Sequence, residues 1–154
     1  LVSKEREMSR RVFIRESAIL VGSALAANTM AQIGCVASAA PTVRVDVLGN
    51  RVRVDTARQE LLRVGDGIQL DADALDYPIL LIRLSDQRFV ALSTECMHLG
   101  CRVKKQPAVI RCPCHGSVYD LEGKVLNGPT ERPLKQYRVG LDGTVAHIEL
   151  VQLE

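Results

Sequence analysis

The sequence predicts a mainly β domain of short antiparallel strands, preceded by one N-terminal transmembrane helix. Three observations support this prediction. Residues 18–40 form a stretch without a single charge. From residue 43 onward, apolar side chains recur with a period of two, and turn-forming residues separate the runs. No long stretch after residue 41 shows helical periodicity, and residues 56–63 are the best short candidate for a helix.

Composition narrows the function classes. The chain has 154 residues, enough for one domain, and its 47% of apolar and 25% of charged residues are typical of a folded protein. The formal net charge is +2, and this excess of bases falls within residues 1–17. So small a charge argues against nucleic-acid binding by bulk electrostatics. The unusual feature is five cysteines, four of them between residues 96 and 114.

The N-terminal segment has the pattern of an export signal. Residues 10–14 read Arg-Arg-Val-Phe-Ile, which is typical of a twin-arginine signal. As a helix, residues 18–40 would reach roughly 34 Å, enough to cross a bilayer. We therefore interpret 1–17 as a cytoplasmic twin-arginine region and 18–40 as an uncleaved, single-pass anchor, with its basic end inside.

Two alternatives to a retained anchor stay open. The small residues 37–39 would suit cleavage of a signal peptide. Cys35 would suit a lipoprotein, although Gln32 stands where a Leu is expected three residues earlier. If the anchor is kept, the rest of the chain lies on the periplasmic side of a bacterial inner membrane, where disulfides persist. Cys35 is then expected to be a free thiol within the anchor.

The domain is expected at residues 43–154, and a linker or hinge together with the first strand is expected at 41–50. Small, weakly patterned residues at 36–42 suggest that linker. The valines at 43, 45 and 47 alternate with polar residues, which predicts a strand. Gly49-Asn50 offers a turn into a second alternating run around Val52 and Val54.

Two further hairpins are predicted downstream. The continuous apolar run 79–84 is followed by the polar turn 85–87 and by a second apolar run, 89–92. Near the end, residues 137–139 and 145–150 flank a turn assigned to 140–143. His147 belongs to this last run and has no cysteine neighbour, so we interpret it as an ordinary strand residue.

Two short boxes carry the chemistry: Cys96-Met97-His98-Leu99-Gly100-Cys101 and Cys112-Pro113-Cys114-His115-Gly116-Ser117. Each box offers thiol and imidazole groups within a few residues. A zinc site of two Cys and two His would leave one cysteine of each box without a role. A pure disulfide framework would leave both histidines unused. On residue types alone, both alternatives stay open.

The two boxes resemble those of Rieske iron–sulfur proteins, specifically the subunit of cytochrome bc-type quinol-oxidising complexes. The usual first box of that family has Thr where this chain has Met97, and the other five positions match. The second box matches at all six positions. The sequence Gly-Pro-Thr at 128–130 resembles the proline loop that covers the cluster in the family. The resemblance implies an antiparallel β domain with a small inserted cluster-binding subdomain, at about 94–134.

The resemblance also implies a ligand set for one [2Fe–2S] cluster. Cys96 and Cys112 would bind one iron, and His98 and His115 the other. A disulfide between Cys101 and Cys114 would tie the two loops together. The exposed His98 and His115 would be the catalytic residues, taking up a proton as the cluster takes an electron, and His115 would hydrogen-bond the quinol.

Other residues receive supporting roles from the same resemblance. Ser117 and Tyr119 would donate hydrogen bonds to cluster sulfurs and raise the reduction potential. Leu99 would shield the cluster and pack on a partner, and Pro129 would limit access of water. Gly100, with Gly116, would permit tight loops. Pro113 would stiffen the second loop.

These residues are compatible with four functions. The resemblance favours the electron-transfer subunit of a quinol–cytochrome c reductase, working with a cytochrome b-type subunit, a c-type cytochrome and quinol in a dimeric, multi-subunit complex. The alternative is the Rieske small subunit of an arsenite oxidase-like molybdoenzyme. The predicted signal and the second cysteine pair argue against a soluble Rieske ferredoxin. A structural zinc module is the fourth possibility.

Overall fold

The computed structural model describes residues 40–58, 61 and 63–153, and the structural statements below concern these residues. Within them the chain is entirely strand, turn and loop, as the prediction of a mainly β domain requires. This part of the chain contains no helix long and apolar enough to cross a membrane. The twin-arginine region and, apart from Ala40, the anchor fall outside the described residues and stay predictions.

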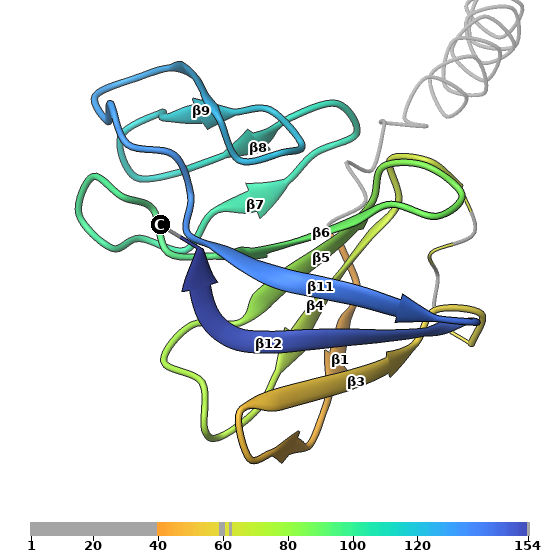
Figure 1. Cartoon of the computed structure of the whole chain (residues 1–154). Coiled ribbons are helices and arrows are strands. Elements are labelled where there is room, and N and C mark those ends of the chain that lie inside the picture. Colours follow the sequence, from red (N-terminus) through yellow and green to blue (C-terminus); the bar gives the residue numbers. More distant parts are fainter. Residues whose placement is uncertain (1–39, 59–60, 62, 154) are drawn as a thin grey trace, which may run out of the picture. The chain divides into compact units, whose positions relative to one another are not determined.

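The described strands form a large sheet and a small one (Figure 1). The large sheet has eight strands in the order β1-β4-β5-β6-β11-β12-β3-β2, and the small sheet has four in the order β10-β9-β8-β7. The strands of the large sheet are β1 Thr42–Arg44, β2 Val47–Leu48, β3 Arg51–Asp55, β4 Gly67–Asp71, β5 Ile79–Arg83, β6 Phe89–Ser93, β11 Gln136–Asp142 and β12 Val145–Leu153. The strands of the small sheet are β7 Lys104–Lys105, β8 Ile110–Arg111, β9 Val118–Tyr119 and β10 Val125–Asn127.

The large sheet departs from the wholly antiparallel arrangement that was predicted. Strand β1 pairs with β4 in parallel, with Thr42 opposite Gln69. The expected single strand over residues 43–47 is also wrong, because β1 ends at Arg44 and β2 starts at Val47. The two strands lie at opposite edges of the sheet, so the chain must leave one edge and join the other between them. The predicted turn at Gly49-Asn50 is confirmed, since β2 pairs antiparallel with β3.

Two further details of the prediction need correction. The described residues of the helix candidate 56–63 form a turn at 56–58 and irregular structure at 61 and 63, and the Thr56 N–H donates a hydrogen bond to the Thr144 carbonyl at 2.8 Å. The last hairpin turns at Gly143-Thr144, two residues later than expected, because β11 continues to Asp142, opposite Val145. The apolar runs 79–84 and 89–92 do form the paired strands β5 and β6.

Strand β5 explains how the small sheet is attached. Its side chains alternate between two cores: Ile79 and Leu81 enter a core inside the large sheet, whereas Leu80 and Ile82 enter a second core below the small sheet. Being buried on both faces, β5 reads as a continuous apolar run in the sequence. Cys96 and Cys112 belong to the second core. The candidate site therefore rests on the face of β5 and β6 that looks away from the first core (Figure 1).

Candidate metal centre

The two boxes form loops of matching conformation. In the first, the Cys96 N–H donates to the Cys101 carbonyl at 2.9 Å, and the Gly100 N–H donates back to the Cys96 carbonyl at 2.9 Å. In the second, the Cys112 N–H donates to the Ser117 carbonyl at 2.8 Å, and the Gly116 N–H donates to the Cys112 carbonyl at 3.1 Å. Each loop thus closes on itself and presents its side chains to the other.

A glycine at the fifth position makes each loop possible. Gly100 has φ 73° and Gly116 has φ 80°, which lie in the left-handed region that residues with a Cβ avoid. Their expected role in tight loops agrees with these angles. The segment just before the first loop is also held in place, since the Thr94 hydroxyl donates a hydrogen bond to the Pro78 carbonyl at 2.9 Å.

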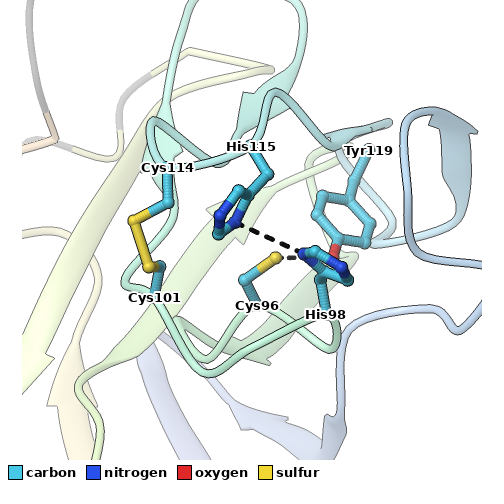
Figure 2. The surroundings of a disulfide bond; sticks show 6 residues. All are labelled: Cys96, His98, Cys101, Cys114, His115 and Tyr119. Carbon is cyan, nitrogen blue, oxygen red and sulfur yellow. Dashed lines mark hydrogen bonds between the residues drawn. A yellow bond between two sulfur atoms is a disulfide. The ribbon is translucent and has the colours of Figure 1, made fainter.

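The disulfide implied by the family resemblance is present. Cys101 and Cys114 are bridged, with their Cα atoms 6.5 Å apart, and the bond joins the two loops at one side of the site (Figure 2). Among the described cysteines, only Cys96 and Cys112 are free, and both are buried. The disulfide therefore removes Cys101 and Cys114 from the candidate ligands.

The surroundings of Cys96 favour its thiolate form. Burial works to raise its pKa, but hydrogen bonds from the Tyr119 hydroxyl and from the His98 N–H outweigh it, and the pKa lies below the usual value. The Tyr119 oxygen lies 3.3 Å from the Cys96 sulfur. Burial, together with this contact, raises the pKa of Tyr119 to about 12. Tyr119 therefore keeps its proton at physiological pH and can donate a hydrogen bond to the Cys96 sulfur.

The two histidines of the boxes meet at the open side of the site. Their Nδ1 atoms lie 3.3 Å apart, and the rings are nearly perpendicular, at 85° (Figure 2). Two nitrogens that share a tetrahedral metal at about 2.05 Å are separated by about 3.3 Å, since a tetrahedron's edge is about 1.6 times the bond length. His98 and His115 therefore have the spacing of two ligands to one ion.

Ser117 provides an independent sign that a group is bound here. Its hydroxyl is buried, and it is the one buried side-chain polar atom of the described residues without a hydrogen-bond partner. Leaving such a donor unpaired costs about 1–3 kcal/mol. A sulfide of a [2Fe–2S] cluster would accept this hydrogen bond, as would a metal-bound Cys96 thiolate, whose pKa the nearby Ser117 hydroxyl helps to lower. The buried donor therefore fits a site that holds sulfur acceptors, as a [2Fe–2S] cluster does.

The segment after β10 closes over the second box. Gly128 has φ 125°, and a Cβ placed on it would lie 2.4 Å from the Ser117 Cα. The Gly-Pro-Thr segment thus contacts the backbone of the second box directly. Pro129 is exposed and lines a hollow beside His98, together with Arg132. Its expected role in excluding water stays a prediction.

Replacing Gly128 with alanine should destabilise the protein by about 1–3 kcal/mol, because the new Cβ collides with rigid backbone and cannot be relieved by moving a side chain. Gly143→Ala is the matched control: Gly143 also has a positive φ, of 57°, but nothing lies within 4 Å of the added Cβ. Chemical denaturation of both variants measures the difference. Equal losses of stability would show that the contact with Ser117 is unimportant.

Two contacts around the site were not predicted from the sequence. Arg132 donates to the Met97 carbonyl at 2.8 Å and thereby ties the Gly-Pro segment to the first box. Lys135 pairs with Glu95 at 2.7 Å, directly before the first box. In both pairs the two residues lie 35 or more positions apart in the chain, so no local sequence pattern predicts these contacts.

The other candidate residues differ in exposure and in their place in the fold. Leu99 is 69% exposed at the tip of the first loop, next to the histidines. Tyr119 is fully buried, and Pro113 and Cys114 are exposed. His147 lies on β12 opposite Arg53 of β3, in the large sheet. Its sheet position agrees with an ordinary strand role.

Comparisons with known proteins agree with the site. The model of the Rieske [2Fe-2S] domain family matches residues 52–138. The cytochrome b6-f complex iron-sulfur subunit of Chlorobaculum tepidum is 30% identical over 138 residues, which is 88% of this chain and 72% of the relative. The subunit of the same name from Chlorobaculum thiosulfatiphilum is 46% identical over 55 residues, 34% of this chain and 30% of that protein.

A solved structure supports the fold. One chain of a hyperthermophilic respiratory Complex III matches with a TM-score of 0.52 and 24% identity, over 90% of this chain and 99% of that one. The family match covers both boxes and more than half of the chain. The chain is therefore a member of the Rieske [2Fe–2S] domain family, an electron-transfer protein that carries a [2Fe–2S] cluster.

Proposed function

We propose that Cys96 and Cys112 bind one iron of the cluster and that His98 and His115 bind the other. The support is the division of the site: both free cysteines are buried, and both histidines face outward with Nδ1 atoms 3.3 Å apart. Two neutral imidazoles in place of two thiolates leave less negative charge at the site, so an added electron meets less repulsion.

We propose further that the chain oxidises quinol and passes the electron to a c-type cytochrome. When bound, the cluster supplies one-electron redox chemistry. The observation that carries the proposal is the outward position of the two imidazoles. Within the described residues, Nε2 of neither ring has a hydrogen-bond partner. Each Nε2 is therefore free to form a hydrogen bond with a ligand outside the protein, and it would accept that ligand's proton only in a ring that has lost its own.

The residues around the histidines suit this role. His115 is the more exposed of the pair, so we assign it the hydrogen bond with the quinol hydroxyl. His98 stands beside it as the second, half-buried ligand and lines the hollow formed with Pro129 and Arg132. Leu99 offers an apolar contact at the tip, where it would pack on the partner that holds the quinol.

Tyr119 and Ser117 should place the reduction potential in the upper part of the Rieske range. A hydrogen bond to a sulfur stabilises the more negative, reduced state. In Tyr119→Phe, the potential should fall by about 40–60 mV, if the lost bond is stronger in the reduced state by about 1–1.4 kcal/mol. A redox titration of the purified protein measures this. Tyr137→Phe, in the other core, is the control; an unchanged potential in Tyr119→Phe would contradict the assignment.

The proposed setting is a membrane complex. The expected anchor at 18–40 would hold the chain in a bacterial inner membrane, with the domain on the periplasmic side. A cytochrome b-type subunit would supply the quinol site, and a c-type cytochrome would accept the electron. The likeness to a cytochrome b6-f complex iron-sulfur subunit supports this setting.

Purification of the full chain from native membranes tests the proposal. We expect b-type and c-type haems to co-purify with it and the preparation to reduce cytochrome c with quinol. In Tyr137→Phe this activity should persist, whereas His115→Ala should lose it with both haem types still present. Co-purification of a molybdopterin subunit instead would replace this proposal with the arsenite oxidase-like alternative.

A further inference from the structure

Three sulfur atoms gather at the base of the second loop. The Sγ atoms of Cys101, Cys112 and Cys114 all lie within 4.8 Å of one another. Two of them form the disulfide between the loops, and the third belongs to a free, buried thiol. Cys112 thus stands next to a disulfide that it does not share.

We propose that Cys112 is an intramolecular nucleophile toward the Cys101–Cys114 disulfide whenever no iron occupies its sulfur. Thiol–disulfide exchange needs a thiolate close to a disulfide sulfur and no outside oxidant. The Cys112 sulfur attacks the Cys101 sulfur, a Cys101–Cys112 bond forms, and the Cys101–Cys114 bond breaks. The proton lost by Cys112 ends on the released Cys114 thiolate, so atoms and electrons balance.

Attack at Cys101 is favoured over attack at Cys114. A bond between Cys112 and Cys114 would close a ring across the single residue Pro113, whose ring fixes φ, and short stiff loops close poorly. The alternative bond joins the same two loops as the existing disulfide does. Exchange therefore leaves the loops connected and moves the bridge by two positions along the second box.

The consequence is a competition between iron and the disulfide for Cys112. This step rests on the ligand role of Cys112 proposed above. Bound iron holds the thiolate and protects the original bridge, whereas a chain without a cluster passes into a form whose Cys112 cannot bind iron. Cluster insertion and the position of the bridge are then linked, and reversal of the exchange must precede reloading.

The exposure of Cys114 provides the readout. Cys96 and Cys112 are about 1% exposed, whereas Cys114 lies at the surface. Exchange converts a buried free thiol into an exposed one, which N-ethylmaleimide labels in the folded chain. The experiment takes the full chain with its cluster, removes the iron with a chelator in the absence of thiols, and maps label and bridges by mass spectrometry over time.

In the cluster-free chain, we expect label to accumulate at Cys114 together with a Cys101–Cys112 bridge, at a rate independent of protein concentration. Cys112→Ser should lose this labelling, whereas Cys96→Ser, which also removes a proposed ligand, should retain it. The loaded chain should label at Cys114 at least tenfold more slowly. The proposal is overturned by an unlabelled Cys114 in the cluster-free chain, by equal labelling in Cys112→Ser, or by a rate proportional to concentration.

Comparison of the cluster-free chain with the loaded chain separates this proposal from the ligand assignment. Exchange in the cluster-free chain depends only on the three sulfurs, so it tests the nucleophile. If exchange occurs there but the loaded chain labels equally fast, iron does not hold Cys112, and the ligand assignment fails while the nucleophile stands.

Discussion

His115→Ala should reduce the cluster content of the purified protein to less than about a tenth of the wild-type value, since even the loss of partners that only support metal ligands lowers metal affinity 10–100-fold. The Nδ1 atoms of His98 and His115 lie 3.3 Å apart at the open side of the site. If both bind one iron, removal of either imidazole leaves that iron with one ligand too few. Iron analysis and the visible spectrum of the purified protein measure the loss.

The third histidine of the described residues provides the control. His147 lies on β12, in the large sheet and opposite Arg53, so His147→Ala removes an imidazole without touching either box. We expect its cluster content to match that of the wild type. If His115→Ala kept a full cluster, the proposed ligand set would be wrong, whatever metal the site holds.

Among the proposed substitutions, those that remove the disulfide should have the second largest effect, which is a loss of thermal stability. Cys101 and Cys114 are separated by 13 positions, and closing a loop of that length in the unfolded chain is worth about 3 kcal/mol. The double variant Cys101→Ser/Cys114→Ser should therefore melt about 10 °C or more below the wild type. The four proposed ligands remain, so the variant should still bind its cluster at low temperature.

The double variant avoids an unpaired exposed thiol, which a single substitution at Cys101 would leave at Cys114. Thermal loss of the visible absorption, followed beside far-ultraviolet circular dichroism, gives the melting temperature. A shift of less than about 3 °C would mean that the second core alone holds the two loops together.

The chain's strands could be predicted where their patterns were simple. The uniform apolar run at 79–84 and the turn at Gly49-Asn50 indicated β5 and the β2–β3 hairpin, because burial and turn chemistry act locally. The parallel pairing of β1 with β4 could not be predicted in this way. It depends on the chain crossing between two edges of a sheet, which no short window of sequence encodes.

The candidate site, too, could be predicted from the sequence only where its residues are close together in the chain. Both boxes stood out because their cysteines, histidines and glycines lie within six residues of one another. The contact of Gly128 with the Ser117 backbone and the bond from Arg132 to Met97 join distant segments, so only the folded arrangement shows them. The buried, unpartnered Ser117 hydroxyl likewise becomes informative only when burial is known.

The central claim is that the two loops hold a [2Fe–2S] cluster through two cysteines and two histidines. Metal and sulfide analysis of the purified full chain, combined with electron paramagnetic resonance after one-electron reduction, tests it most directly. The account predicts two irons and two acid-labile sulfides per chain and a paramagnetic signal from the reduced protein. Zinc as the only metal, without sulfide and without a signal on reduction, would contradict it.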